Sequence, residues 1–269
     1  MANLLRERSD DGVLLLTLNR PERKNAFDEA LWDAATDALR EARADHDIGA
    51  VVVTGAGADF SAGVDLASFG EAPPRSDGHP TGYHAFMAEL VEFDKPLLAA
   101  VRGVGVGIGC TLLLHCDVVH VGASVRLRLP FVALGLVPEA ASSFLLGQVV
   151  GTRQAAEVLL TAEWLDAARA VEVGIATQAF ADAELLPATL AKARAIATHP
   201  VGALQATKRT LLAARREAVR AALAAEDEGM RRQVGSPENV EAITAFLEKR
   251  KPDFRRLTRA APPGEAGSG

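Results

Sequence analysis

Short apolar runs alternate with helix-like segments over much of the chain. Residues 12–19 (GVLLLTLN), 50–57 (AVVVTGAG) and 97–101 (LLAAV) are apolar and bounded by turn residues, a pattern typical of buried strands. Residues 28–43 begin with an aspartate and place an apolar residue at every third or fourth position, which predicts an amphipathic helix. Strands that alternate with helices predict an α/β core with largely parallel strands.

The pattern becomes mostly helical in the second half of the chain. Two more short strands are expected at residues 117–122 and 125–129, and helices at residues 83–93, 107–115, 141–150, 153–160, 166–173 and 184–198. Helix-forming residues then continue to Lys251. We therefore expect an α/β core at residues 1–195, a C-terminal helical region at 196–256 and a disordered tail at 257–269.

Composition and charge exclude several classes of function. The 269 residues have a formal net charge of −6 and no basic tract, which argues against nucleic acid as a partner. No segment approaches the ~18–20 uncharged apolar residues of a membrane span, and the N-terminus lacks a signal-peptide pattern, so we expect a cytoplasmic protein with no membrane partner. Cys110, Cys116 and the six histidines have no metal-ligand spacing, and no metal is expected.

The segment VRGVGVGIGCTLLLHCD places four glycines, Gly103, Gly105, Gly107 and Gly109, at alternate positions before an apolar helix. It is not a dinucleotide fingerprint, because the third glycine of that motif falls on Cys110, and no Lys-Ser/Thr pair follows as in a phosphate-binding loop. Two interpretations remain. The glycines either expose amide donors at a helix N-terminus to an oxyanion, or they allow close packing of the helix on a sheet.

Two polar side chains suggest chemistry. Ser61, in DFSAGVDL, approaches a nucleophile elbow, but Asp59 stands where the motif requires glycine, so a serine hydrolase is a weak alternative. Glu139, in GLVPEAASS, interrupts an otherwise apolar run from Leu134 to Leu146. It either complements a helix dipole or, if it lies in an apolar pocket, acts as a general acid or base with a raised pKa.

Several motifs occur in the order found in the crotonase (enoyl-CoA hydratase/isomerase) superfamily. NRPERKNAF resembles the first coenzyme A loop of that family, and GAGADFSAGVDL and KPLLAAVRGVGVGIGCTLLLHCDVV resemble its two oxyanion-donor blocks. AFLEKRKPDF resembles the helix end that closes over coenzyme A. The resemblance implies a spiral of ββα units with a C-terminal helical region, assembled as a homotrimer or homohexamer. It implies a coenzyme A thioester as substrate and no separate cofactor.

The resemblance also implies roles for individual residues. The amides of Val64 and Ile108 fall where the family has its oxyanion donors, with Ile108 where glycine is more usual. The side chain of Ile108 is expected beside Phe131 and Leu134 in an apolar shell around the acyl group. The residues implied to contact the coenzyme A thioester are Arg23, Lys24, Ala26, Ala62, Gly63, Asp65, Leu66, Gly107, Phe131, Leu134, Lys249 and Lys251. For the two lysines, a solvated helix end is an equal alternative.

The chain departs from the hydratase pattern at two positions. Thr111 and Phe131 stand where hydratases of the family have glutamates, and neither residue transfers a proton at neutral pH. Glu139 instead resembles the single glutamate of Δ3,Δ2-enoyl-CoA isomerases, as in fatty acid β-oxidation. We therefore expect a double-bond shift through a dienolate, with Glu139 as acid and base. The alternatives are a hydratase or another acyl-CoA reaction of the family, and a non-catalytic acyl-CoA-binding paralogue.

Overall fold

The computed structural model describes residues 2–65 and 82–260. Its main sheet has six strands in the order β1-β2-β3-β4-β6-β8. Only β1 and β2 are antiparallel, and the other neighbours are parallel. The strands are β1 (Leu4–Arg8), β2 (Val13–Leu18), β3 (Ala50–Gly55), β4 (Leu97–Val101), β6 (Val118–Gly122) and β8 (Gln178–Phe180). The predicted α/β core with largely parallel strands is confirmed.

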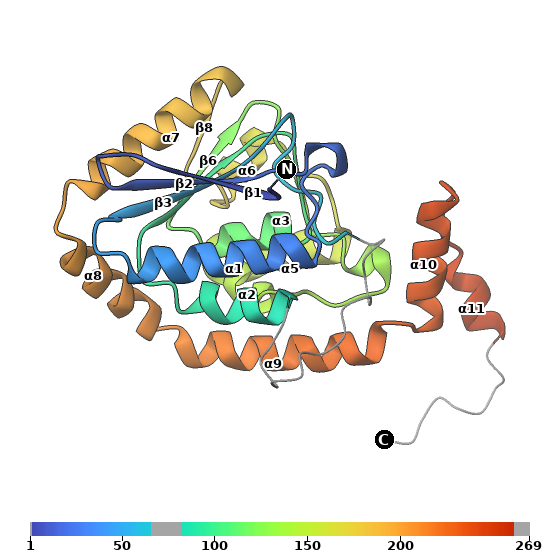
Figure 1. The fold of residues 1–269 in the computed structure, drawn as a ribbon. Helices are drawn as coiled ribbons and strands as arrows, with labels where there is room; N and C mark the ends of the chain where they lie inside the picture. Colours follow the sequence, from blue (N-terminus) through green and yellow to red (C-terminus); the bar gives the residue numbers. More distant parts are fainter. Residues whose placement is uncertain (1, 66–81, 261–269) are drawn as a thin grey trace.

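Helices cover both faces of this sheet (Figure 1). On one face, α1 (Glu29–Ala44) packs against α2 (Gly82–Val91), and on the other α7 (Asp182–Ala197) contacts β3, β4 and β6. The central strand β3 is buried on both faces, because Val51 and Val53 join one hydrophobic cluster and Ala50 and Val52 join the other. Residues of a strand alternate between faces, so a continuous apolar run fits a two-sided core.

The glycine stretch forms more than the expected helix. Residues 104–106 are strand β5 (Val104–Val106), which pairs with β7 (Arg126–Arg128) in a second, two-stranded sheet. The helix expected at residues 107–115 is one α-turn, α3 (Ile108–Thr111), followed by the 3-10 helix η2 (Leu112–His115). The short strands β1, β5 and β8 were not predicted. β1 and β8 are largely exposed, and β5 consists of Val-Gly-Val, so none has a hydrophobic run.

The remaining helices follow the predicted order. They are α4 (Ser142–Val150), α5 (Thr152–Thr161), α6 (Ala167–Glu172), α8 (Val201–Ala213), α9 (Arg216–Gln233), α10 (Pro237–Leu247) and α11 (Phe254–Ala260), with 3-10 turns η1 (Pro21–Arg23) and η3 (Val132–Leu134). α9 packs on α4, while α10 packs on the 3-10 turn η3 and on α11 at one end of the molecule (Figure 1). α11 extends into the segment expected as a tail, and residues 261–269 lie outside the described part. The division at residue 195 stays a prediction.

Close packing explains three of the four glycines. A Cβ on Gly103 would overlap the carbonyl oxygen of Ala58. A Cβ on Gly105 would lie 2.7 Å from Cδ2 of Leu127, and a Cβ on Gly109 would overlap the carbonyl oxygen of Ser61. Real Cβ atoms do not approach other atoms so closely, so α3 lies against the Ser61 loop only because these positions lack side chains. The close-packing interpretation of the stretch therefore holds at Gly103, Gly105 and Gly109.

This packing predicts opposite effects for two Gly→Ala substitutions. Gly109→Ala should lower the free energy of unfolding by about 1–3 kcal/mol, because the new methyl group overlaps backbone. Gly202→Ala, in α8 with no atom within 4 Å of the new Cβ, should raise it by about 0.4–1 kcal/mol through the unfolded state. Urea unfolding measures both, and equal changes in the two variants would contradict the packing argument.

Candidate active site

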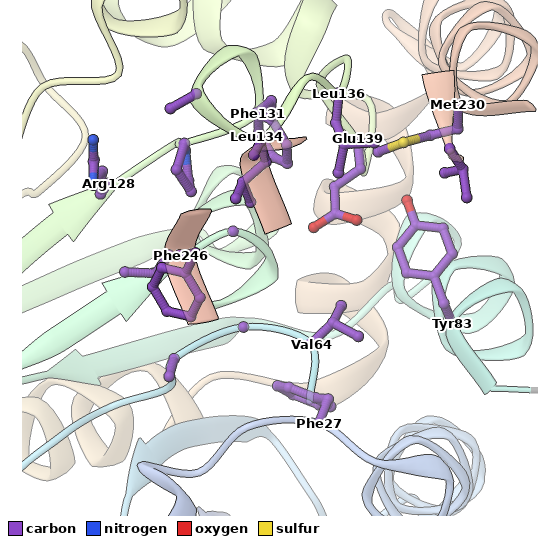
Figure 2. Close-up of a pocket in the computed structure, with 18 of the residues that line it drawn as sticks. Phe27, Val64, Tyr83, Arg128, Phe131, Leu134, Leu136, Glu139, Met230 and Phe246 are labelled. Carbon is purple, nitrogen blue, oxygen red and sulfur yellow. The ribbon is translucent and has the colours of Figure 1, made fainter. Parts of the chain in front are cut away.

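One large cavity, of 1310 Å³, opens between the sheet elements, α2, α9 and α10. Its surface is mostly apolar, as in sites for small organic ligands. Figure 2 shows Glu139 with its carboxyl group directed into this space between Val64, Tyr83 and Leu134. The residues of the predicted site that line the cavity are Lys24, Ala62, Gly63, Val64, Gly107, Phe131, Leu134 and Glu139. The structure therefore brings eight of the predicted residues to one space.

The amide of Val64 is left free by the bridge that holds its loop. Phe27 pairs with Val64 in a parallel bridge, in which the Phe27 N–H donates to Gly63 O at 2.7 Å and the Asp65 N–H donates to Phe27 O at 2.9 Å. In such a bridge the central residue's own N–H faces the other way. No acceptor for the Val64 N–H is found among residues 2–65 and 82–260. This amide is therefore free to donate to a ligand.

The amide of Ile108 is free because it starts a helix. Gly107 precedes α3 with φ 54°, a left-handed conformation that suits glycine, and the first N–H groups of a helix have no intrahelical acceptor. Within the described part of the chain, nothing accepts from the Ile108 N–H. The expectation for its side chain was wrong. The Ile108 side chain is fully buried in the hydrophobic core and does not line the cavity.

Gly107 lies where the two donor segments approach the carboxyl group of Glu139. A Cβ built on Gly107 would lie 3.7 Å from Oε1 of Glu139 and 4.0 Å from Cα of Gly63, and a Cβ on Gly63 would lie 2.8 Å from Val106 O. The loop before Val64, the turn before Ile108 and the carboxyl group of Glu139 thus meet at one point. The geometry at Gly107 therefore agrees with the oxyanion-donor interpretation of the glycine stretch, while the other glycines of the stretch allow close packing.

The environment of Glu139 changes its acidity. The residue keeps some accessible surface because its carboxyl group faces the cavity, but protein surrounds it on the other sides. Burial, and secondly the nearby carboxylate of Glu226, raise the pKa of Glu139 from 4.5 to about 7. A carboxyl group with this pKa exchanges protons readily near neutral pH, as general acid–base chemistry requires.

Three side chains from distant elements hold the backbone that follows Glu139: the partly buried Tyr83 and the buried His115 and Glu226. The Ala140 N–H donates to the hydroxyl of Tyr83 at 2.8 Å, and Nε2 of His115 donates to Ala140 O at 2.8 Å. The carboxylate of Glu226 accepts from the N–H groups of Ala141 at 2.7 Å and Ser143 at 2.8 Å. We call Tyr83, His115 and Glu226 the loop clamp.

The sequence did not reveal the loop clamp. His115 is a buried core residue whose ring nitrogen is satisfied by its hydrogen bond to Ala140 O. Burial lowers its pKa to about 4, so it is neutral near pH 7. Tyr83 and Glu226 were missed, because their partners are backbone groups 57 and 85 residues away in the chain. The only available signal was a glutamate among the alanines of AALAAEDEGM.

The comparisons with known proteins agree with this geometry. A family model described as enoyl-CoA hydratase/isomerase matches residues 8–257. The chain belongs to the enoyl-CoA hydratase/isomerase family. A crystal structure of an enoyl-CoA hydratase/isomerase from Pseudoalteromonas atlantica T6c, 36% identical, superimposes with a TM-score of 0.89 over 94% of this chain and 99% of that one. The predicted crotonase fold with a C-terminal helical region is confirmed.

The relatives within the family are named for different activities. The 2,3-dehydroadipyl-CoA hydratase of Escherichia coli is 37% identical over 90% of this chain and 95% of its own. The 1,2-epoxyphenylacetyl-CoA isomerase of the same organism is 32% identical over 94% and 99%. The human enoyl-CoA delta isomerase 2 is 30% identical over 90% of this chain and 62% of its own. This chain is therefore a crotonase-family protein similar to hydratases and to isomerases alike.

The two positions of the hydratase glutamates have no proton carrier. Phe131 lines the cavity with its ring. Thr111 is fully buried away from it, and no described residue gives its hydroxyl a hydrogen bond. The carboxylates that line the cavity are Glu139, Glu226, Asp28, Glu29 and Asp227. Of these, Glu139 is the one beside Gly107.

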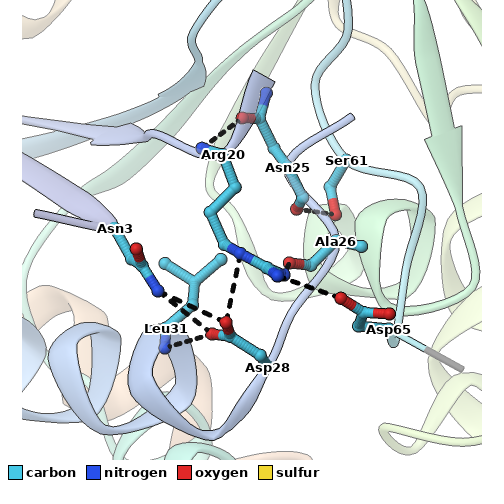
Figure 3. Close-up of polar contacts among 8 residues, drawn as sticks. All are labelled: Asn3, Arg20, Asn25, Ala26, Asp28, Leu31, Ser61 and Asp65. Atoms are coloured by element: carbon cyan, nitrogen blue, oxygen red, sulfur yellow. Dashed lines mark hydrogen bonds and ion pairs between the residues drawn. The ribbon is translucent and has the colours of Figure 1, made fainter. Parts of the chain in front are cut away.

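Ser61 has a structural role that the elbow interpretation did not foresee. It is fully buried, donates its hydroxyl to Asn25 O at 2.9 Å and accepts the Gly63 N–H at 3.2 Å (Figure 3). Nearby, the guanidinium of Arg20 bridges Asp28 at 3.1 Å and Asp65 at 3.0 Å. These contacts tie the first coenzyme A loop to the Val64 loop. A buried, doubly bonded Ser61 outside the cavity argues against a serine hydrolase.

Some expected coenzyme A contacts do not reach the cavity. Arg23, Lys249 and Lys251 are exposed outside its lining, and Ala26 is buried behind it. Asp65 is occupied by Arg20, and Leu66 lies outside the described residues. These assignments came from positions in motifs, which do not say which way a side chain points. Cationic side chains that do line the cavity, besides Lys24, are Arg126, Arg128, Arg231 and Arg250.

The raised pKa of Glu139 predicts a pH-dependent effect on stability. The native state holds the Glu139 proton up to about pH 7 and the unfolded chain only to about pH 4.5, so wild-type stability falls as pH rises through this window. Glu139→Gln removes that loss. Its free energy of unfolding relative to wild type should therefore increase by up to about 3 kcal/mol between roughly pH 4.5 and pH 8.

Urea unfolding across this pH range measures the difference. Glu217→Gln, an exposed carboxylate on α9 outside the cavity lining, provides the control, and its difference from wild type should stay nearly constant. A Glu139→Gln difference that does not change with pH would contradict the raised pKa.

Proposed function

We propose that this protein is an enoyl-CoA isomerase that moves a double bond of an enoyl-CoA from Δ3 to Δ2. The observation that carries the proposal is the position of Glu139 beside Gly107, next to the two segments that present the free amides of Val64 and Ile108. The ionised carboxylate removes a proton from C2 of the 3-enoyl thioester, and the two amides hydrogen-bond the dienolate oxygen that results. The same carboxyl group then returns the proton to C4, so atoms and charge balance.

The acidity of Glu139 fits both halves of this reaction. A carboxylate with a pKa near 7 is a stronger base than an ordinary glutamate, and it is still substantially ionised at neutral pH. After the first step the protonated form is stable enough to persist beside the dienolate. Phe131, Leu134 and Leu136 form apolar walls around this space, which keeps water from protonating the intermediate.

The coenzyme A portion fits the cationic part of the cavity. Arg128 and Phe246 lie on the side of Glu139 opposite Tyr83 (Figure 2), and Arg126 and Arg250 also line the cavity. Guanidinium groups suit phosphate oxygens. We infer that the pantetheine chain passes along this side and that the acyl chain extends toward Tyr83. The homotrimer or homohexamer implied by the family resemblance stays part of the proposal.

Hydration is the second candidate, and the similarity to one named hydratase supports it. The similarity to a 2,3-dehydroadipyl-CoA hydratase extends over 90% of the chain. Hydration, however, needs a base for water and an acid for the α-carbon, and Thr111 and Phe131 supply neither. A hydratase would have to use Glu139 for both transfers, with an ordered water in the cavity.

Isomerase activity should disappear with the carboxyl group of Glu139. Purified protein is assayed spectrophotometrically with trans-3-hexenoyl-CoA for isomerisation and with crotonyl-CoA for hydration. We expect isomerisation with little hydration, and Glu139→Gln should lose at least ~10²-fold in kcat, the usual contribution of a general base. In wild type, kcat/KM should rise with pH to a plateau, with a midpoint near pH 7, because the ionised carboxylate is the active form.

The other outcomes distinguish the alternatives. Hydration that survives Glu139→Gln would overturn the single-glutamate mechanism. No turnover of either substrate, with acyl-CoA binding intact by calorimetry, would favour a non-catalytic acyl-CoA-binding protein.

A further inference from the structure

Glu226 is a buried carboxylate that the proposed reaction does not use. It lies on α9, is 5% exposed, and lines the cavity in which Glu139 acts. Both of its oxygens are occupied, one by the Ala141 N–H and the other by the Ser143 N–H. Burying a charged group costs free energy unless its partners compensate. A serine or asparagine could cap the helix at this place with a smaller cost of burial.

The backbone that Glu226 holds is the backbone next to Glu139. Ala140 and Ala141 have φ values of 60° and 57°, a left-handed conformation that costs a residue with a Cβ roughly 1–2 kcal/mol. Helix α4 starts at Ser142, so the two amides that Glu226 accepts are at its N-terminus, where amides lack intrahelical partners. Without these acceptors, the turn would relax and Glu139 would change direction.

We propose that Glu226 is a positioning residue of the active site, which fixes the turn at residues 140–143 and so directs the carboxyl group of Glu139 at the oxyanion donors. The proposal rests on the isomerase function above. Glu226 touches no reacting atom. It acts through Ala141 and Ser143, and through the charge that it places near Glu139.

The charge of Glu226 adds a second effect. Burial raises the pKa of Glu226, while its hydrogen bonds from Ser143 and Ala141 oppose that rise. In its ionised form, Glu226 raises the pKa of the neighbouring Glu139. The other titratable and charged groups that face this space come from several elements. They are Tyr83 and His84 on α2, His115 on η2, Asp227 and Arg231 on α9, Asp28 and Glu29 near the start of α1, Arg126 and Arg128 on β7, and Lys24 and Arg250 in loops. Of all these groups, Glu226 has the main electrostatic effect on Glu139.

Three variants separate position from charge. Glu226→Gln keeps the shape, loses the charge and leaves one backbone N–H without an acceptor. Tyr83→Phe removes the acceptor of the Ala140 N–H without changing charge. Glu217→Gln makes the same chemical change at an exposed site of α9 outside the cavity lining, and serves as the control.

For Glu226→Gln we expect kcat to fall about tenfold or more, and the pH midpoint of kcat/KM to fall by about one unit. Tyr83→Phe should lower kcat with a much smaller change in midpoint, and Glu217→Gln should match wild type. A folded Glu226→Gln protein with wild-type kcat or an unchanged midpoint would overturn the proposal. If Glu226→Gln does not fold, Glu226→Asp keeps the charge but withdraws it from the two amides, and wild-type kcat in that variant would overturn the proposal equally.

A titration without substrate distinguishes this proposal from the isomerase function. The carboxylic-acid infrared band of Glu139 is isolated as the difference between a protein and its Glu139→Gln counterpart, and is followed against pH with and without Glu226→Gln. A midpoint lowered by about one unit supports the action of Glu226 on Glu139 even if the enzyme turns out to catalyse another reaction. An unchanged midpoint overturns it even if isomerisation is confirmed.

Discussion

The candidate site depends on the hydrogen bonds that hold the turn between Glu139 and α4. Two consecutive alanines adopt left-handed conformations there, and four backbone polar groups would be left without partners if the loop clamp were absent. Each buried hydrogen bond contributes about 1 kcal/mol, and an unpaired buried group costs about 1–3 kcal/mol. The clamp therefore outweighs the backbone strain, and it fixes a carboxyl group at the point where two other loops present free amides.

The same arrangement creates an electrostatic conflict. Glu139 and Glu226 are both carboxyl groups in a poorly solvated region, and burial raises the pKa of each of them. The two environments differ, because two backbone N–H groups donate to Glu226, whereas the carboxyl group of Glu139 faces an apolar cavity. Proteins commonly give up stability at sites where chemistry requires a strained or poorly solvated group.

Relatives that are named for different activities share this family, so the fold alone does not determine the reaction of this chain. A hydratase and two isomerases share the family and much of the chain length with this protein. The backbone donors are properties of the fold, since they arise from a parallel bridge at Phe27 and a helix start at Gly107. The proton carriers are single side chains, and substituting one of them changes the reaction available to an enolate that the donors stabilise.

The sequence determined the parallel strands, the order of the helices, and the glycines at which two backbones approach, because apolar runs, periodicity and glycine all act locally. It also marked Glu139, since a carboxylate within an apolar run is unusual. Only the tertiary structure decided that Ile108 turns its side chain into the core, and that Tyr83 and Glu226 reach the turn after Glu139. Side-chain direction, and contacts between residues far apart in the chain, depend on packing between elements, which no local pattern encodes.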